Sequence, residues 1–472
     1  MSTTSLALSN WRPPAPPLRS NLAVGLSLAI GRAPELLQTL PRDCYYKDVV
    51  VVPVGKRPVF IVNDPEIIRR IFIDDHMHYP KSDLMIAALA PLLGDGVLVS
   101  NGSVWEHDRR MLEPAFAHMR VEQMFPLMQA AVSDFLSRLA ALGSDTVIDL
   151  EAQLSHVTAD IMFRTIFSRS LDGEVAAQVF AAFMRFQRNA PQFDLRVILR
   201  SDPDRPEPLS DALLQDATLL RGLMTRLLDE RLAALARGEA FVDFAQSVVD
   251  ARDAMGMPFS RERRIDQLAV FFLAGHETTA SALSWTLFLL SQQRHVLAQC
   301  RSEIQSVLGD RAFETADLKR LPLLRNVFRE GLRLYPPAAF LTRRALQQDR
   351  FGRYRVPVNS FVVVSPWLVH RHRQHWESPD HFNPDRFASA MPRVGTYIPF
   401  GLGPRVCTGA NIAQLEAALI MTEVLRRYDL IPVNPDSVFP ITRVTIRPSD
   451  GIACRVVSVA SRYPRDVQTG SS

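Results

Sequence analysis

The spacing of apolar and polar residues divides the chain into a long helical part followed by a shorter part rich in small strands. From about Val104 to the mid-200s, apolar residues recur at helical spacing, interrupted by a polar, proline-rich stretch from Ser201 to Pro208. After about Leu334, prolines and short β-branched runs such as 361–364 predict small sheets and loops. Residues 411–427 are helical again. The pattern predicts a mostly α protein with a small β region.

Segments nearer the N-terminus carry further predictions. The β-branched runs 49–54 and 58–62, separated by a glycine-containing turn, predict a hairpin. Asp64 followed by Pro65 predicts a helix start, because aspartate caps a first turn and proline fits its first position. Residues 79–104 mix glycine, proline and apolar side chains and are expected to be irregular.

The stretch 265–290 is apolar on nearly every face, which predicts a helix buried through the middle of the protein. A membrane-spanning helix is the competing interpretation, but the polar break from Gly275 to Thr279 at its centre disfavours it. A structural kink is the simplest explanation of that break. Residues 21–30 are mildly apolar and too short to span a bilayer.

Composition narrows the class of protein. The 472 residues are 47% apolar, which is ample for a large core, and the net charge is only +4. Basic and acidic residues are interleaved without an aromatic–basic array, so nucleic-acid binding is not expected. Nearly all basic residues are arginine, which we interpret as the bias of a GC-rich, bacterial coding sequence. With no CxxC pair, the cysteines indicate neither a disulfide framework nor a zinc site and favour a reducing, cytoplasmic compartment: Cys44, Cys300, Cys407 and Cys454.

One cysteine stands in a loop suited to metal binding. From Phe400 to Gly409 the chain reads Phe-Gly-Leu-Gly-Pro-Arg-Val-Cys-Thr-Gly, just before a helical stretch. Gly403 and Gly409 are expected to adopt backbone angles that a side chain would forbid. Backbone N–H groups, the helix start and Arg405 would then favour the thiolate of Cys407, and a lone thiolate is a good axial ligand for haem iron. An ordinary buried cysteine beside a turn is the alternative.

The full spacing of this segment resembles the haem-binding motif of the cytochrome P-450 family, Phe-x-x-Gly-x-Arg-x-Cys-x-Gly, with every position filled. The resemblance implies the cytochrome P-450 fold, a mostly helical triangular prism around haem b. It also implies that Cys407 is the iron ligand and that Phe400, Arg405 and Gly409 help to bind the cofactor.

The same resemblance implies one catalytic domain, expected at residues 45–460. Residues 1–44 are expected to form a proline-rich arm and lead-in, extended over 11–17, and residues 461–472 a tail. Microsomal members of the family carry an N-terminal anchor, and no transmembrane anchor is expected here. We expect a monomer.

The polar break in the central helix is similar to the family's oxygen-activation motif, Ala/Gly-Gly-x-Asp/Glu-Thr. Gly275, which follows Ala274, would let haem or dioxygen approach the backbone. The Thr278 hydroxyl can donate to a carbonyl one turn earlier and so leave a polar notch, into which Glu277 can pass protons. His276 is expected to point elsewhere and to be structural.

Two further stretches match the family. Glu330 and Arg333 lie three residues apart, which alone indicates an ordinary surface pair. In the family such a pair joins a later arginine, here Arg386, and the resemblance implies a buried ionic triad that supports the haem-binding core. His370, His372 and His375 invite a metal interpretation, but their spacing is irregular and the segment resembles the family's His-Arg-x-x-x-x-Trp loop, so a second metal is not expected.

The two haem propionates need cationic partners, and arginine suits carboxylates. The resemblance puts forward Arg405, Arg109 after Trp105, and Arg343. Arg344 is the alternative to Arg343, because the alignment can slip by one residue. Trp105 could also donate its indole N–H to a propionate. For each arginine a solvated surface charge is the alternative.

The resemblance implies a monooxygenase that puts one atom of O2 into a hydrophobic substrate, using electrons that originate in NAD(P)H. A separate ferredoxin and its reductase are expected to deliver them, the acidic ferredoxin meeting an arginine-rich face around Arg405. The alternatives are a peroxide-driven enzyme, a haem-thiolate isomerase or dehydratase, and a non-catalytic haem sensor; Glu277 and Thr278 argue against all three. Substrate identity is not predicted, but an apolar pocket is expected from Met85, Ile86, Phe183, Phe186, Phe271, Phe272, Phe340, Leu341 and Phe439.

Overall fold

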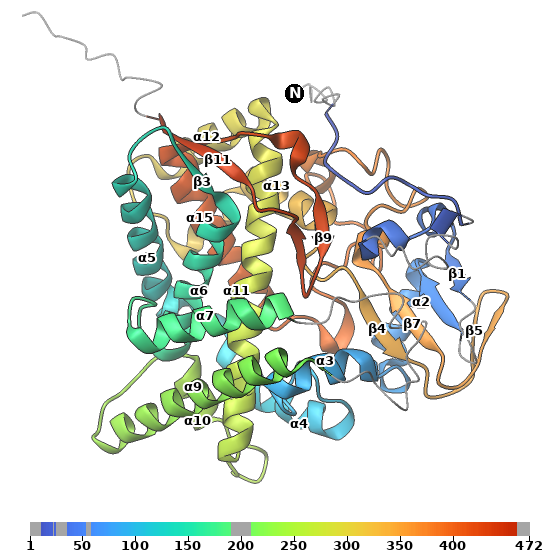
Figure 1. Cartoon of the computed structure of the whole chain (residues 1–472), viewed down its shortest axis with the longest axis horizontal. Coiled ribbons are helices and arrows are strands. Elements are labelled where there is room, and N and C mark those ends of the chain that lie inside the picture. The colour runs from blue at the N-terminus through green and yellow to red at the C-terminus, as the bar shows by residue number, and fades with distance from the viewer. Residues whose placement is uncertain (1–10, 22, 25–34, 53–57, 190–208, 460–472) are drawn as a thin grey trace, which may run out of the picture.

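A computed structural model describes residues 11–21, 23–24, 35–52, 58–189 and 209–459. Helices make up the larger part of the molecule; β1, β4, β5 and β7 lie on one flank, while β3 and β11 lie beside the helices on the other side (Figure 1). The helices are α2 Pro65–Arg69, α3 Asp83–Leu93, α4 Gly102–Leu112, α5 His118–Ala141, α6 Leu150–Phe167, α7 Glu174–Asn189, α9 Asp211–Ala236, α10 Phe244–Asp250, α11 Arg261–Ser291, α12 Arg294–Leu308, α13 Pro322–Leu334, α14 Pro366–Val369 and α15 Ala410–Arg427. The hairpin turn at 53–57, the polar stretch 201–208, most of 21–30 and the tail 461–472 lie outside the described residues.

The strands form small sheets, as predicted. They are β1 Val49–Val52, β2 Val59–Val62, β3 Thr146–Asp149, β4 Leu341–Arg344, β5 Asp349–Phe351, β6 Tyr354–Val356, β7 Phe361–Val364, β8 Tyr428–Pro432, β9 Pro440–Thr442, β10 Ile446–Pro448 and β11 Ala453–Ser458. The largest sheet has the order β1-β2-β7-β4, and β1 pairs antiparallel with β2, which confirms the predicted hairpin. β2 and β7 are parallel, whereas β4 runs antiparallel to β7.

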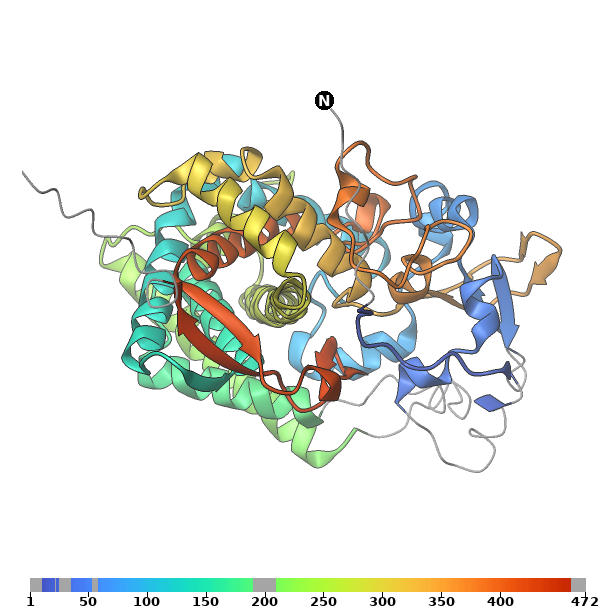
Figure 2. The same cartoon turned by 90° about the horizontal axis from the view of Figure 1, so that it is seen from above.

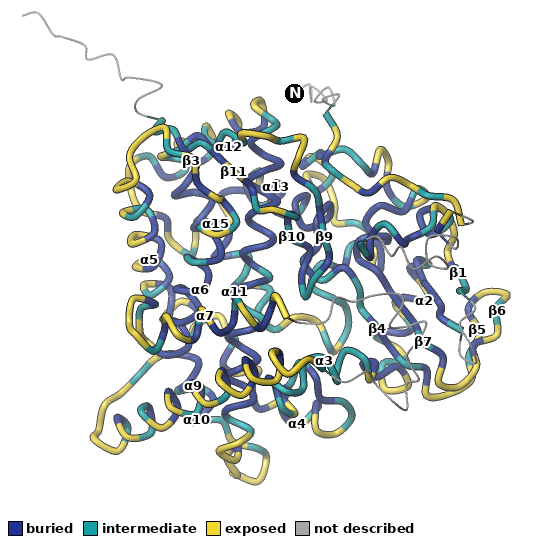
Figure 3. Tube along the Cα trace, in the orientation of Figure 1, coloured by how far each residue is buried: buried dark blue, intermediate teal, exposed yellow. Residues whose placement is uncertain are grey.

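Helix α11 is the axis of the helical part. Figure 2 looks nearly along it and shows other helices around it, and Figure 3 shows it buried along most of its length. The Ser260 side chain accepts a hydrogen bond from the backbone N–H of Arg263 and so caps the first turn. The predicted helix at 265–290 is confirmed, with one extra turn at its start. Apolar residues on every side explain this burial, because no face of the helix prefers water.

Two sequence expectations were wrong in detail. Residues 79–104 are not irregular throughout: α3 runs from Asp83 to Leu93 and α4 begins at Gly102. Pro91 lies in the last turn of α3 without preventing the helix, which ends at Leu93 with Gly94 as its C-cap. The helical region is also interrupted by the short strand β3, which pairs with β11. The start of α2 at Pro65, capped by the Asp64 carboxylate, is confirmed.

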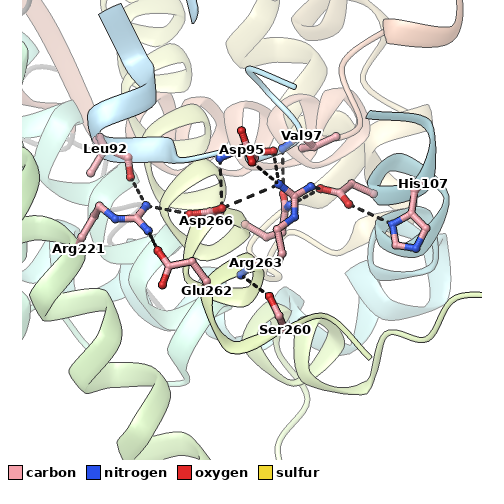
Figure 4. Close-up of polar contacts among 11 residues, drawn as sticks. Leu92, Asp95, Val97, His107, Arg221, Ser260, Glu262, Arg263 and Asp266 are labelled. Atoms are coloured by element: carbon pink, nitrogen blue, oxygen red, sulfur yellow. Dashed lines mark hydrogen bonds and ion pairs between the residues drawn. The ribbon is translucent and has the colours of Figure 1, made fainter. Parts of the chain in front are cut away.

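The segment that joins α3 to α4 is held on α11 by a polar network (Figure 4). The Asp108 carboxylate accepts hydrogen bonds from Arg263 and, at 2.7 Å, from Gln267. Arg221 of α9 donates to Asp266 at 2.8 Å, and Asp266 also accepts from the backbone N–H of Asp95 at 3.2 Å. This network fixes α4, and with it Trp105 and Arg109, relative to the central helix.

Residues 11–18 of the N-terminal arm form no helix or strand, and they pack on the helical part. Trp11 makes an edge-to-face contact with Phe288 of α11 at 6.0 Å between ring centroids. The Tyr335 hydroxyl donates to the carbonyl of Pro14 at 2.6 Å. Among the residues that the structure describes, no helix has the length and apolar character needed to cross a membrane.

Candidate functional site

The loop before α15 is folded tightly around Cys407. The Cys407 N–H donates to the carbonyl of Phe400 at 2.9 Å. Gly401 and Gly403 adopt φ of +77° and +72°, and a Cβ at Gly403 would lie 2.1 Å from the carbonyl oxygen of Phe72. The expectation for Gly409 was wrong: its φ is −82°, and it precedes the first residue of α15. Its N–H instead forms a hydrogen bond to the Cys407 sulfur.

The electrostatics of the sulfur differ from the sequence expectation. Cys407 is accessible to solvent, but crowding by protein atoms raises the pKa of its thiol, and the Gly409 N–H and the Arg109 charge only partly oppose this. The protein alone therefore favours the thiol, and a bound metal ion would supply the remaining stabilisation of a thiolate. The nearby charge is Arg109, which donates to the Val406 carbonyl at 2.8 Å, rather than Arg405.

Two buried cations, Lys81 and Arg343, and the half-buried Arg405 lie near this loop. Lys81 and Arg343 form an isolated backbone bridge at the edge of β4, which places their side chains in the same region. The Lys81 ammonium donates to the carbonyls of Val97 and Ser100 at 2.9 and 3.2 Å. The Arg343 guanidinium lies 4.5 Å from the Phe72 ring centroid, and that of Arg405 lies 4.2 Å from the Trp105 ring centroid.

Lys81, Arg343 and Arg405 have no carboxylate ion-pair partner within the part of the chain that the structure describes, and only Arg405 feels the charge of a carboxylate, that of Glu106. Burial, together with the neighbouring arginines Arg405, Arg343 and Arg109, lowers the pKa of Lys81 to about 6. Burial and the Arg405 charge lower the pKa of Arg343 to about 9. Burial lowers the pKa of Arg405 to about 10, against the opposing charge of Glu106, and its Nε has no hydrogen-bond partner. Buried cations with unmet charge suit an anionic ligand.

The cluster also decides between two adjacent arginines. Arg343 is 7% exposed and points into this cationic region, whereas Arg344 forms an ion pair with Asp83 at 2.6 Å. Arg343 therefore belongs to this group of cations and Arg344 does not. Lys81 was missed by sequence reasoning, because nothing near a lone lysine before α3 indicates that β4 will lie beside it.

Helix α11 presents one small accessible face. Between Ile265 and Ser291 every residue is buried except Ala274, Gly275 and Thr278, which share one side of the helix. The Thr278 hydroxyl donates to the Ala274 carbonyl at 2.6 Å, as predicted. Gly275 acts differently from the expectation, because a Cβ there would lie 2.5 Å from the Met162 sulfur. The missing side chain thus lets α6 pack closely on α11.

Glu277 and His276 lie away from that face. The Glu277 carboxylate is buried and accepts from the Thr445 hydroxyl at 2.9 Å, while its second oxygen has no partner. Burial raises the pKa of Glu277, against the opposing charge of Arg447 and the hydrogen bond from Thr445. Burial lowers the pKa of His276 to about 3, and its ring packs on Phe183 and Phe272, which agrees with a structural role.

The predicted ionic triad is present. Both Glu330 oxygens accept from Arg333, at 2.6 and 2.8 Å, and one accepts from Arg386 at 3.3 Å. Glu330 and Arg333 have 0% side-chain exposure.

Comparison with known proteins assigns the family. The family model described as Cytochrome P450 matches residues 14–454. This chain belongs to the cytochrome P450 family. It is 30% identical over 450 residues to the cyclooctatin synthase of Streptomyces melanosporofaciens, covering 94% of each chain. It is 29% identical to the protein LUTEIN DEFICIENT 5, chloroplastic, of Arabidopsis thaliana, covering 87% of this chain and 72% of that protein. It is also 26% identical to a cytokinin hydroxylase of the same plant, covering 84% and 78%.

Membership makes this P450 a haem-thiolate monooxygenase of the mostly α, P450 fold. It is an oxidoreductase that uses haem, dioxygen, an organic substrate and a source of electrons. The site described above has the two features that haem requires, an accessible cysteine sulfur and buried cations for two carboxylates.

Proposed function

We propose that Cys407 binds the haem iron and that Lys81, Arg343 and Arg405 hold the haem propionates, with Arg109 and Trp105 beside them. The observation that carries this proposal is the set of buried cations without a carboxylate partner, which lies near the one cysteine of the described residues that is exposed. Phe400 supports the loop by accepting the Cys407 N–H bond, and Gly409 contributes an N–H to the sulfur.

The reaction proposed is a monooxygenation: RH + O2 + 2e⁻ + 2H⁺ gives ROH + H2O. Bound haem supplies the activation of dioxygen, with electron density donated by its sulfur ligand. The accessible face of Ala274, Gly275 and Thr278 borders the space for dioxygen, and the Thr278 hydroxyl positions water there. Glu277 holds a proton and passes it toward Thr278 when its side chain leaves Thr445.

The substrate proposed is a hydrophobic organic molecule. Four of the phenylalanines expected in the pocket pack in the core instead: Phe183, Phe186, Phe271 and Phe272 are at most 7% exposed. The half-buried apolar residues are better candidates: Met85, Ile86, Phe340, Leu341 and Phe439. The names of the relatives, a cyclooctatin synthase and a cytokinin hydroxylase, agree with oxidation of small organic molecules.

Electrons are proposed to come from NAD(P)H through a reductase and an acidic ferredoxin, in a bacterial cytoplasm. Arg405 is turned toward Trp105, so it offers less charge to a partner than the sequence suggests. Arg110 is exposed on α4 and is a better docking candidate. Turnover that falls steeply with added salt, and falls again in Arg110→Glu while haem spectra stay intact, would support this route; salt-independent turnover would contradict it.

The iron ligand is tested by the carbon monoxide difference spectrum of the reduced protein. The wild type should give a thiolate-type Soret band, and Cys407→Ala should lose it. Cys300→Ala, which removes a buried thiol on α12, should keep the band and serves as the control. A Cys407→Ala protein that kept the band would refute the assignment.

Thr278→Ala separates a monooxygenase from a haem sensor. The variant should consume NAD(P)H with severalfold less product per turnover, because the hydroxyl that positions water is gone. The matched control is Thr279→Ala, whose hydroxyl makes the same type of backbone bond, to Gly275 at 3.0 Å, but is buried. A sensor would form no product in either protein, and its ligand affinity would be unchanged.

A further inference from the structure

A pair of histidines outside the haem site has unmet hydrogen-bonding capacity. His372 is 0% exposed, and neither of its ring nitrogens has a hydrogen-bond partner. The His375 ring stacks on it, with centroids 4.6 Å apart and planes at 27°, and the Nε2 atom of His375 is also buried without a partner. Such atoms are costly to bury, because they have lost water and gained nothing in return.

The neighbouring His370 has a different role, although the sequence groups the three together. Its Nε2 accepts the backbone N–H of Ile398 at 2.8 Å, and its Nδ1 lies 3.2 Å from the Arg333 carbonyl. Both of its nitrogens are therefore occupied. In the sequence, the irregular spacing of the three histidines argues against a metal site. That argument does not apply here, because only His372 and His375 have nitrogens available as metal ligands.

A third ligand comes from a distant part of the chain. The Asp48 carboxylate lies just before β1, and its ligand atoms and those of His372 and His375 all lie within 4.8 Å of one another. The backbone holds this arrangement in place: the carbonyl of Asp48 accepts from the N–H of Asn63 at 2.7 Å, and Arg373 donates its N–H to the Tyr45 carbonyl at 3.0 Å. The three groups therefore converge without help from the haem.

We propose that Asp48, His372 and His375 form a binding site for a divalent transition-metal ion, with zinc as the best fit. Two imidazoles and one carboxylate, leaving a position for water, are a typical ligand set for this ion. Tetrahedral ligand atoms at zinc stand about 3.3 Å apart, so binding requires a small closure. Asp48 is exposed and His375 half-buried, which leaves both side chains free to move toward His372.

The metal would join the lead-in to β1 to the loop that follows α14. That loop also supplies the carbonyl of His370, which accepts from Arg333 at 2.8 Å. The ion would therefore stabilise the junction between the sheet and the haem-supporting triad, without entering the oxidation chemistry.

The test is an isothermal titration calorimetry experiment in which Zn²⁺ is added to tag-free, haem-loaded, full-length protein. We expect one Zn²⁺ per chain, a rise of the unfolding midpoint on zinc addition, and affinity at least tenfold weaker in Asp48→Asn and in His375→Gln. These two variants change partly exposed residues, so the test does not depend on replacing the buried His372. Asp43→Asn and His381→Gln remove the same groups at nearby positions outside the triplet and should bind as the wild type does.

A zinc-edge anomalous difference map from soaked crystals provides the positional readout. A peak bounded by Asp48, His372 and His375 is expected. The proposal is overturned if no saturable zinc binding occurs, if the peak lies elsewhere, or if both variants bind zinc as tightly as the wild type.

Discussion

Two groups of buried cations in this P450 differ in where their opposing charge comes from. In the first group, Arg333 and Arg386 share the carboxylate of Glu330, and carbonyls satisfy the remaining N–H groups of Arg333. In the second group, Lys81, Arg343 and Arg405 repel one another, and no ion pair of the described residues includes any of them. Arg333, Lys81 and Arg343 are all buried, so solvent does not explain the difference between the two groups.

The difference separates folding from cofactor binding. An uncompensated buried charge costs several kcal/mol, and the chain avoids that cost at Glu330 by supplying both signs itself. At Lys81 and Arg343 the chain supplies positive charges only, so the compensating negative charge has to come from a bound ligand. The first group should therefore determine whether the protein folds, and the second whether it retains haem.

Breaking the first group should have the largest effect. Glu330→Gln leaves Arg333 buried without its counter-charge and should lower the free energy of unfolding by about 3–5 kcal/mol. Urea unfolding, followed by circular dichroism, measures this in both haem-loaded and haem-free protein. The matched control is Asp229→Asn, which breaks the fully exposed ion pair with Arg261 and should leave the unfolding midpoint unchanged.

A Glu330→Gln protein as stable as the wild type would contradict the comparison. A protein of normal stability that had lost haem alone would also contradict it, because Glu330 would then belong with the second group.

Sequence reasoning reached the first group and only part of the second. Glu330 and Arg333 lie one helical turn apart, so their spacing places them on one face, whereas their meeting with Arg386 was implied by the resemblance to the family. Lys81 and Arg343 are brought together by a bridge at the edge of β4, and a contact between such distant residues leaves no periodic pattern. For the same reason, the sequence did not predict that Asp48 lies close to His372 and His375.

Local geometry was likewise predictable only where it depends on residues close together in the sequence. The hydroxyl bond of Thr278 depends on residues one turn away and was predicted, as was the buried course of α11. The role of Gly275 depends on Met162 of another helix and was not. The pKa of Cys407 depends on how many protein atoms surround the sulfur, and a loop sequence does not specify that.

Arg343→Met should have the next largest effect, and it acts on haem rather than on folding. Losing one charge-assisted bond to a propionate should speed haem transfer to an acceptor protein about ten- to hundredfold. The haem-free variant should be more stable than haem-free wild type, because a buried, uncompensated cation has been removed.

Arg344→Met is the matched control, since this arginine is adjacent but already paired with Asp83. Its haem transfer rate should match the wild type within about twofold, because a partly exposed ion pair contributes little. Equal effects of the two substitutions, or a larger effect at Arg344, would show that the assignment of the propionate contact to Arg343 is wrong.

The last effect is the smallest per pH unit and the most specific, and it concerns Lys81. In the haem-free protein, burial and the nearby arginines lower the pKa of Lys81 from 10.5 to about 6, so between these values the unfolded chain binds a proton that the folded chain has released. Stability must then rise with pH across this window, with a slope of at most about 1.4 kcal/mol per pH unit from this group. Below pH 6 both states hold the proton and the slope vanishes.

Urea unfolding of haem-free protein between about pH 6.5 and 9 measures that slope, and Lys81→Met isolates the part due to the ammonium group. The wild type should gain stability relative to the variant as pH rises. In haem-loaded protein the difference should disappear, because propionates keep Lys81 charged in the folded state and restore its pKa. A wild-type slope that survives in Lys81→Met, or one that haem leaves unchanged, would mean that Lys81 does not face the cofactor, and the contrast between the two cation groups would then rest on Arg343 and Arg405 alone.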